Sequence, residues 1–374
     1  MEKIHGVNLG NWLVLEKWMD VRLFEGTGAD DEIWLSRKLD RETLHRKIKA
    51  HRDSFITEQD FANIAAHGVN LVRIPVPYFI FGDREPLPGG IEYVDLAFQW
   101  AKKYGLKILL DLHTVPGSQN GYDNGGLTGV CKWSKSPDEV EFALSVLERL
   151  ALRYGQEEAL YGIQPVNEPI SFIVWVSSPS FGKAVDKAEA KGGSYVSMKF
   201  LRSFYLEAYK RLRAILPEDK VIVFHDGFRL KRWKSFFTKN ELKNVMLDTH
   251  IYIFAMEGFL PISVLPVYRA YVAMNRRSIR SVSRYVPVVV GEWCISNKYA
   301  GNSKAEEMQA RYRQVADLQL QAWSESAGFI YWSYKLWPEP DLPMDDAWKE
   351  AWDLNRDWAR GYMPTNFRTL EYDN

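Results

Sequence analysis

One stretch of the chain indicates the fold: Val286-Pro287-Val288-Val289-Val290-Gly291-Glu292-Trp293. Its apolar residues are continuous rather than alternating, which is typical of a parallel strand covered on both faces. A carboxylate, Glu292, stands where this run ends. In parallel α/β folds the C-terminal ends of the strands hold the active site, so this carboxylate is a candidate for chemistry.

Similar short apolar runs recur along the whole chain. With the first run included, we predict eight strands: Ile4–Leu9, Asn70–Val76, Lys107–His113, Leu160–Asn167, Val221–His225, Asn244–Ile251, Val286–Glu292 and Gly328–Tyr334. Amphipathic helical stretches lie between them, for example the one that Thr57 caps and Gly68 ends. Strands that alternate with helices, eight in all, predict an α/β fold with a single (β/α)₈ TIM barrel.

Three connections are too long for simple loops: Thr114–Ser136, Ile170–Ser197 and Phe254–Leu265. All three follow predicted strands, so we expect them to enlarge the C-terminal face of the barrel, where a substrate pocket forms. Neither a linker nor a shift in composition marks a domain boundary in the 374 residues, and we expect one domain over residues 1–374.

Composition narrows the possible ligands. The 48 basic and 48 acidic residues cancel, which argues against nucleic acid and gives no reason to expect a membrane partner. The 14 Trp residues favour carbohydrate, because sugar rings stack on aromatic planes, although a large aromatic core also accounts for them. Cys131 and Cys294 have no metal-ligand spacing. The N-terminus shows no signal peptide, so we expect a cytoplasmic protein, or a secreted one whose leader has been removed.

A second carboxylate ends another predicted strand, in Ile163-Gln164-Pro165-Val166-Asn167-Glu168-Pro169. A single strand-end Glu is more often an ordinary ion-paired residue than a catalyst. Two of them, Glu168 and Glu292, are what a glycosidase needs, since one serves as acid and the other as nucleophile or base.

Polar and aromatic residues end the other predicted strands as well. Each alone has a structural explanation, but their convergence on one barrel face favours an active site. The residues are Arg73, His113, Asn167, His250, Tyr252 and Trp332.

The chemistry of these residues fits glycoside hydrolysis with retention, which places two carboxyl groups about 5–5.5 Å apart. We expect Arg73 to keep Glu292 ionised and Tyr252 to donate a hydrogen bond to it. We expect burial and the nearby Glu292 to keep Glu168 protonated.

The surrounding residues have predicted roles toward the sugar. Asn167 bonds the sugar 2-OH, and Trp332 forms the floor of the subsite. His113 and His250 bind hydroxyl groups or orient the carboxylates. We expect no metal and no cofactor.

Four stretches resemble glycoside hydrolase family 5 of clan A over nearly the whole chain, and specifically its fungal exo-β-1,3-glucanase subgroup. They are Gly6-Val7-Asn8-Leu9-Gly10-Asn11-Trp12-Leu13-Val14-Leu15-Glu16, Phe55-Ile56-Thr57-Glu58-Gln59-Asp60-Phe61, Val69-Asn70-Leu71-Val72-Arg73-Ile74-Pro75, and Asp111-Leu112-His113 continuing into Pro116-Gly117-Ser118-Gln119-Asn120-Gly121-Tyr122-Asp123-Asn124. The first and the last are the most specific to the subgroup.

The resemblance implies that Glu168 is the acid/base and Glu292 the nucleophile, surrounded by the strand-end residues named above. It implies that Glu16 grips the outer hydroxyl groups of a terminal glucose, which makes a dead-end pocket and exo action. It places Asn124 at the same pocket and Tyr122 as an aromatic clamp on the next sugar. A second clamp falls near Phe254 or Ala255, and Asn11 stands where the subgroup usually has Gly.

These observations predict a retaining exo-β-1,3-glucanase or β-glucosidase that releases glucose from β-glucan oligosaccharides or β-glucosides. We expect it to act as a monomer. Two alternatives stay open: an endo-acting β-1,4-glucanase or mannanase of the same family, and a barrel that binds carbohydrate without cleaving it.

Overall fold

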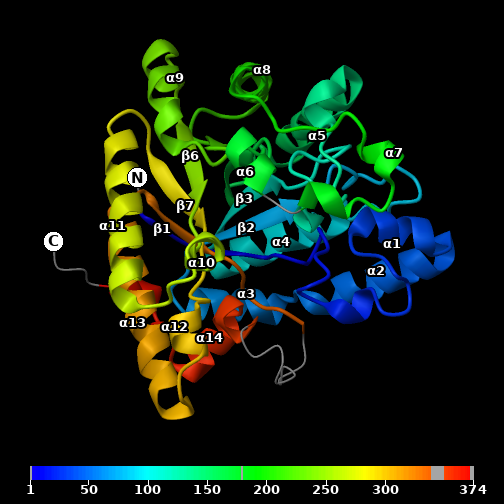
Figure 1. The fold of residues 1–374 in the computed structure, drawn as a ribbon. Helices are drawn as coiled ribbons and strands as arrows, with labels where there is room; N and C mark the ends of the chain where they lie inside the picture. Colours follow the sequence, from blue (N-terminus) through cyan, green and yellow to red (C-terminus); the bar gives the residue numbers. More distant parts are fainter. Residues whose placement is uncertain (1, 178–179, 338–348, 371–374) are drawn as a thin grey trace.

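The computed structural model describes residues 2–177, 180–337 and 349–370. Its centre is a closed barrel of parallel strands in chain order: β1 (Ile4–Asn8), β2 (Leu71–Val76), β3 (Lys107–Leu112), β4 (Leu160–Gln164), β5 (Val221–His225), β6 (Val245–His250), β7 (Val288–Glu292) and β8 (Gly328–Tyr331) (Figure 1). The first strand pairs with the last, Ile4 opposite Gly328, which closes the ring. The predicted (β/α)₈ barrel is confirmed, and each predicted strand is present.

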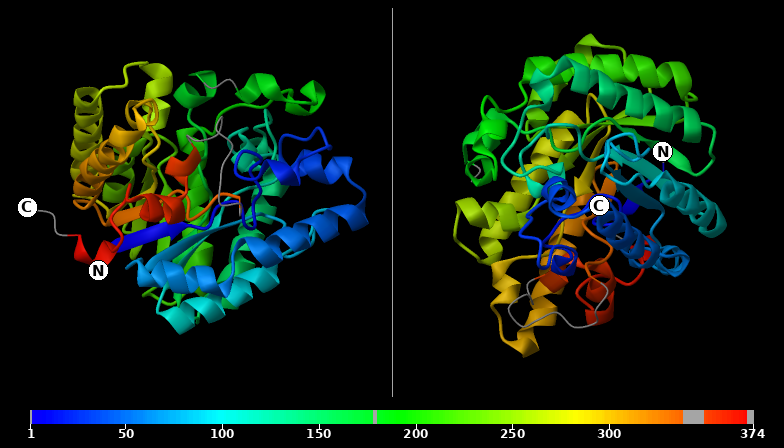
Figure 2. Two further views of the ribbon diagram at one scale, coloured as in Figure 1. Left: turned by 90° about the horizontal axis from the view of Figure 1, so that it is seen from below. Right: turned by 90° about the vertical axis from the view of Figure 1, so that its right-hand side faces the viewer.

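Helices surround the strands on all sides (Figure 2). They are α1 (Glu32–Lys38), α2 (Arg41–Phe55), α3 (Glu58–Ala66), α4 (Ile91–Tyr104), α5 (Pro137–Tyr154), α6 (Phe172–Ser177), α7 (Lys187–Ala190), α8 (Met198–Ile215), α9 (Lys234–Lys239), α10 (Ile253–Phe259), α11 (Leu265–Val282), α12 (Lys298–Gly301), α13 (Ala305–Trp323) and α14 (Leu354–Arg360). Within the described ranges, none is both long and apolar enough to cross a lipid bilayer.

The interior of the barrel has two layers of side chains. The lower one, which we call the apolar layer, consists of Ile4, Leu71, Leu109, Val221, Val223, Met246, Val289 and Ile330. The upper one, which we call the polar layer, consists of Asn8, Arg73, Asp111, Gln164 and Asp248, all fully buried. Side chains on a strand alternate between faces, so Arg73 stands directly above Leu71. The polar layer supports the site at the C-terminal end.

Sequence reasoning placed some boundaries wrongly. Strand β4 ends at Gln164, three residues before the predicted end, because Pro165 has no N–H for the ladder. Helix α2 was not predicted, since its surface is highly charged and only a few apolar residues, such as Leu44 and Ile48, reach the core. Helix α10 occupies much of the predicted 254–265 connection. The predicted cap of α3 is confirmed, where Thr57 and Asp60 form a capping box.

Candidate active site

A cavity of about 290 Å³ lies at the C-terminal ends of the strands. It is lined by Glu16, Trp18, Asn124, Glu168, Tyr252, Phe254, Glu292, Trp332 and Trp352. A larger cavity of about 490 Å³ lies at the opposite end, where Ile4, Leu71 and Lys107 begin their strands. Its only lining carboxylate is Glu2, so it offers no acid–nucleophile pair. The smaller cavity is therefore the candidate active site.

Glu292 is the last residue of β7, and its carboxylate is held from two sides. Arg73 donates to Oε1 at 2.9 Å, and the Tyr252 hydroxyl donates to Oε2 at 2.8 Å. Both contacts were predicted from the sequence. The side chain is 3 % exposed, so it is fixed in the cavity wall rather than free in solvent. A carboxylate held this firmly has one orientation toward a bound substrate.

Glu168 follows β4 with an unusual backbone. Its φ is +44°, in the left-handed region that L-residues rarely adopt. This conformation accompanies a side chain that reaches into the cavity, and such outliers gather at functional sites. Asn124 donates to Oε2 at 2.9 Å, which confirms that Asn124 lies at the pocket, and His250 Nδ1 lies 2.8 Å from Oε1.

His250 connects the two glutamates. The same Nδ1 that contacts Glu168 lies 3.3 Å from Oε2 of Glu292. Because one nitrogen contacts both carboxylates, the two contacting oxygens are no more than about 6 Å apart, which is compatible with the spacing of about 5–5.5 Å that retaining glycosidases use. The other nitrogen, Nε2, lies 3.2 Å from Asp248 Oδ2.

Asp248 is fixed in turn by its own donors. Gln164 donates to Oδ2 at 2.8 Å, and the Gly291 backbone N–H donates to Oδ1 at 2.8 Å. An ionised carboxylate can only accept, so the ring that faces carboxylates with both nitrogens needs a proton on each. Burial lowers the pKa of His250, but Glu292 and Asp248 outweigh burial and raise it well above its usual value.

The protonation predicted from the sequence is wrong for the unliganded site. Burial does raise the pKa of Glu168, but the hydrogen bond and charge of His250 outweigh burial and lower it to about 2. Burial raises the pKa of Glu292, which His250 and Arg73 only partly oppose. The sequence could not show this because it predicted only that His250 binds hydroxyl groups or orients the carboxylates, and it does not give the distances that decide the charge of the ring. These directions favour a proton on His250 over one on Glu168.

Arg73 stands at the centre of the polar layer and below the cavity. Its guanidinium donates to Gln164 at 2.9 Å and to Asn8 at 2.8 Å, and it pairs with Asp111 at 3.0 Å. This fork has a fixed geometry, so it aligns the groups around it. Arg73 thus contacts Glu292 from beneath rather than lining the pocket.

Asn167 and His113 also lie behind the cavity wall. Asn167 Oδ1 accepts from Arg73 at 2.8 Å, and its Nδ2 lies 3.3 Å from His113 Nε2. His113 Nδ1 lies 2.5 Å from Asp111 and its ring stacks on Trp332, 5.5 Å between centroids. Neither residue lines the cavity. In the unliganded site, their polar atoms bond to Arg73, to Asp111 and to each other.

Glu16 lines the cavity together with Trp18. Its Oε2 accepts from Trp18 Nε1 at 2.8 Å, and its backbone N–H donates to Asn11 Oδ1 at 2.9 Å. Asn11 has a φ of +60°, which explains why glycine suits this position and why Asn, which tolerates that region, replaces it. Oε1 of Glu16 is buried without a hydrogen-bond partner in the described structure. That oxygen therefore lacks a polar partner, and burial together with the charge of Asp123 raises the pKa of the Glu16 carboxyl well above its usual value.

Aromatic residues form the remaining wall. Trp352 lies 5.2 Å from Trp18, 5.3 Å from Tyr252 and 5.8 Å from Phe254, measured between ring centroids. Of the two residues near which the second clamp was expected, Phe254 lines the cavity, and it is 45 % exposed. Tyr122 is half-buried on the loop after β3 and is not among the lining residues.

Trp18 and Trp352 were missed by sequence reasoning. Trp18 had a usable signal, since it stands two residues after Glu16 in the most specific stretch. Trp352 had none, because it comes from the chain after the last strand, whose path the strand pattern does not determine.

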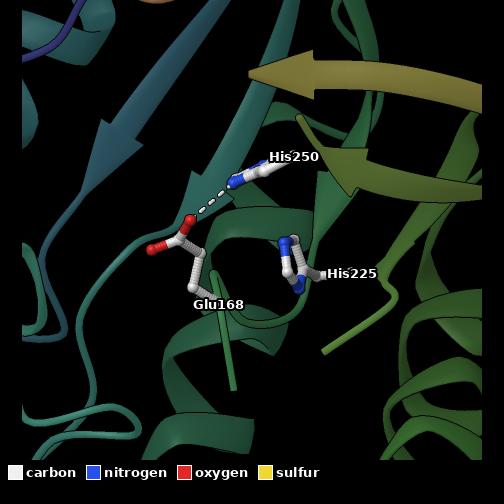
Figure 3. A group of neighbouring side chains, drawn as sticks. All are labelled: Glu168, His225 and His250. Atoms are coloured by element: carbon white, nitrogen blue, oxygen red, sulfur yellow. Dashed lines mark hydrogen bonds and ion pairs between the residues drawn. The ribbon is translucent and has the colours of Figure 1, made fainter. Parts of the chain in front are cut away.

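Glu168, His225 and His250 form the one group in the described chain whose ligand atoms lie close enough for a metal ion, within 4.8 Å of one another (Figure 3). The hydrogen bonds oppose such a site. His225 Nδ1 accepts from the Gly227 N–H at 2.9 Å, so the neutral ring carries its proton on Nε2 and has no lone pair there for a cation. His250 directs both nitrogens at carboxylates. The trio is better described as a proton-bearing cluster.

Comparisons with known proteins agree with this geometry. The family model "Cellulase (glycosyl hydrolase family 5)" matches residues 40–336. "Probable glucan 1,3-beta-glucosidase A" of Emericella nidulans is 32 % identical over 100 % of this chain and 93 % of its own length. "Glucan 1,3-beta-glucosidase 1" of Schizosaccharomyces pombe is 31 % identical over 100 % and 90 %. The crystal structure of a rutinosidase from Aspergillus niger superposes with a TM-score of 0.77 at 23 % identity, over 97 % and 98 %, and shares the fold.

Proposed function

Because this chain belongs to glycosyl hydrolase family 5 and is an O-glycoside hydrolase, we propose that it is a retaining, exo-acting β-glucosidase of the exo-β-1,3-glucanase type. It releases glucose from the non-reducing ends of β-glucan oligosaccharides or related β-glucosides by double displacement. Residues 1–374 act as one catalytic domain.

In this proposal Glu292 is the nucleophile and Glu168 the acid/base. Support for the first role comes from Arg73 and Tyr252, which hold the Glu292 carboxylate in one orientation. Support for the second comes from the position of Glu168 across the cavity, joined to Glu292 through one nitrogen of His250. The shared contact is compatible with the short carboxyl separation of a retaining enzyme, so we assign a covalent glycosyl-enzyme as the intermediate.

One observation carries the exo claim: the buried, unpartnered Oε1 of Glu16. A buried acceptor without a donor is costly, and a sugar hydroxyl supplies that donor. Glu16 and Trp18 both line the cavity, and we place them at its closed end, where a polymer would have to continue. A glucose that bonds Glu16 is therefore the terminal sugar of its chain.

The leaving group lies on the side of Phe254, whose ring is partly exposed at the cavity mouth. Phe254 and Trp352 supply the aromatic surface there, so we assign the stacking of the second sugar to them. The predicted clamp Tyr122 lies outside the cavity lining and has a smaller part in this scheme. The β-1,3 linkage itself is supported by the names of the fungal relatives.

The test is a hydrolysis time course on laminari-oligosaccharides with the anomers of the products resolved by NMR. Glucose as the first product, in the β-configuration, supports a retaining exo enzyme. Mixed oligomers from internal cleavage, or activity confined to β-1,4-glucan or mannan, support an endo-acting relative instead. Binding of oligosaccharides without turnover identifies a non-catalytic barrel.

A further inference from the structure

The two-carboxylate scheme leaves one question about the proton of the first step. A general acid must be protonated before the glycosidic bond breaks. In the unliganded site, however, His250 Nδ1 lies 2.8 Å from Oε1 of Glu168, and Asn124 donates to Oε2 at 2.9 Å. With a proton on Nδ1, Glu168 accepts on both oxygens and has no proton of its own to give.

Among the described residues, His250 is the one whose ring nitrogen contacts Glu168, and it can hold a mobile proton there. Nδ1 of this ring contacts Glu168 and Glu292, and Nε2 contacts Asp248. Asp248 cannot take the proton easily, because it already accepts from Gln164 and from the Gly291 N–H. The ring of His250 thus contacts three carboxylates, and of the two catalytic ones Glu168 is nearer, at 2.8 Å against 3.3 Å for Glu292.

The second histidine of the cluster cannot replace it. His225 is fully buried, and its ring lies edge-on to His250 with 4.3 Å between centroids (Figure 3). Its Nδ1 accepts from Gly227, and burial lowers its pKa to about 3. It therefore stays neutral and offers His250 no lone pair. On the other strands and the loops that follow them, the charged groups near His250 are those of the polar layer, the two glutamates, and Asp226 after β5, which accepts from Thr249 at 2.9 Å and interacts electrostatically with His250.

We propose that His250 is the proton donor to Glu168, so that the two residues together are the general acid of the glycosylation step. This inference rests on the proposed function. In the step, the Nδ1–H bond of His250 breaks and leaves its electron pair on nitrogen, while an O–H bond forms on Glu168 Oε1. The proton then passes from Glu168 to the departing oxygen as the glycosidic bond breaks.

The same geometry explains the timing of the transfer. As Glu292 attacks the sugar, its oxygens lose their negative charge, and one of the two carboxylates at Nδ1 no longer attracts the proton. The proton then favours Glu168, at the moment when the leaving group needs it. When water attacks the intermediate, Glu168 takes a proton from it, and freeing Glu292 restores the charged state of His250.

The decisive experiment compares substrates that differ in their need for an acid. A 2,4-dinitrophenyl β-glucoside leaves without protonation, whereas laminaribiose requires it. The variant His250→Asn keeps a hydrogen-bonding atom near the position of Nδ1 but cannot deliver a proton. We expect kcat/KM to fall by about 10²–10⁴ on laminaribiose and by less than about tenfold on the aryl glucoside. kcat/KM is used because it reports the glycosylation step.

A pH profile gives a second readout. The alkaline limb of kcat/KM reports loss of the proton shared by His250 and Glu168, and such a pair holds its proton more tightly than either member alone. In His250→Asn that limb should therefore move to lower pH. Asp248→Asn removes a negative charge that stabilises the proton on His250, so it should also move the alkaline limb to lower pH. This second variant keeps the test available if His250→Asn does not fold.

His225→Asn is the matched control, since it changes a buried histidine of the same cluster. Its ratio of activities on the two substrates should stay within about threefold of the wild type. Equal losses on both substrates in His250→Asn, or an unmoved alkaline limb, would overturn the inference and make His250 a positioning residue. A wild-type protein that hydrolyses neither substrate would instead overturn the proposed function.

Discussion

The apolar layer and the polar layer lie two residues apart on the same strands, yet they differ in almost every physical respect. Met246 fills space among aliphatic neighbours, whereas Asp248, directly above it, accepts from Gln164, Gly291 and His250. Leu71 and Arg73 differ in the same way on β2. Both layers are fully enclosed, so burial alone does not distinguish them.

The difference shows that the barrel separates stability from chemistry along its axis. The apolar layer contributes through the hydrophobic effect, which is insensitive to pH and to direction. The polar layer contributes through hydrogen bonds and paired charges, which are directional and costly when a partner is lost. Substitutions in the two layers should therefore give different patterns of damage.

The largest effect is expected above the polar layer, at Glu292. Glu292→Gln removes the proposed nucleophile but keeps a side chain of the same shape, so kcat/KM should fall on the order of 10⁴- to 10⁶-fold, as in other enzymes that lose a nucleophile. The unfolding free energy should change far less, because Gln still accepts from Tyr252. Steady-state kinetics with an aryl β-glucoside, together with thermal melting, measure both. Substantial remaining activity would assign the nucleophile elsewhere.

Arg73→Met tests the polar layer itself. It leaves Asp111 and Glu292 buried without their counter-charge, so the unfolding free energy should fall by about 3–5 kcal/mol and activity should be lost with it. Urea denaturation at pH 7 gives the first quantity. Arg73→Lys serves as control: it restores the charge but not the fork, and should recover more stability than activity. A fully stable Arg73→Met protein would contradict the division between layers.

Met246→Ala tests the apolar layer. The cavity it creates should lower the unfolding free energy by about 2–5 kcal/mol, while kcat/KM and its pH profile stay unchanged at temperatures where the protein is folded. Met246→Leu keeps the volume and should cost less than about 1.5 kcal/mol. A shift of the pH profile in the Ala variant would show that the layers are not independent.

The smallest effect concerns a buried carboxylate outside the barrel. Glu32 is 2 % exposed, and burial raises its pKa to about 7, only partly opposed by Arg52. The folded state therefore holds a proton that the unfolded state releases near pH 4.5. The unfolding free energy should fall by about 3 kcal/mol as pH rises from 4.5 past 7.

Glu32→Gln should flatten that dependence, measured by urea denaturation at several pH values. Glu42→Gln, on the exposed surface of α2, is the control and should change stability by less than about 0.5 kcal/mol. If the pH dependence of the unfolding free energy is unchanged in Glu32→Gln, then Glu32 is not the group that loses its proton between pH 4.5 and 7.

The barrel itself was predictable because parallel strands and their covering helices leave periodic patterns. The apolar run before Glu292 and the helix capped by Thr57 were both recognisable. Helices such as α2 escaped because a highly charged surface hides a narrow buried stripe. Periodicity reports burial, and it reports little where burial is slight.

The candidate site was predictable where residues end strands, and less so elsewhere. Glu16 and Asn124 came from a resemblance rather than from the strand pattern, and Trp352 came from neither. The protonation of Glu168 was mispredicted because it depends on distances of about 3 Å between side chains from different strands. A sequence shows which charges are present but not which of them share a proton.

The pairing of β1 with β8 means that the barrel can close only after its last strand has been synthesised. Asn8 donates to the backbone oxygens of Gly291 at 3.0 Å and Tyr331 at 3.1 Å, so one of the first residues made is anchored by some of the last. Arg73 and Asp111 therefore gain their full barrel surroundings only after the strand that closes the ring has been made. The site, which needs Glu292 from β7, is assembled from parts made far apart in time.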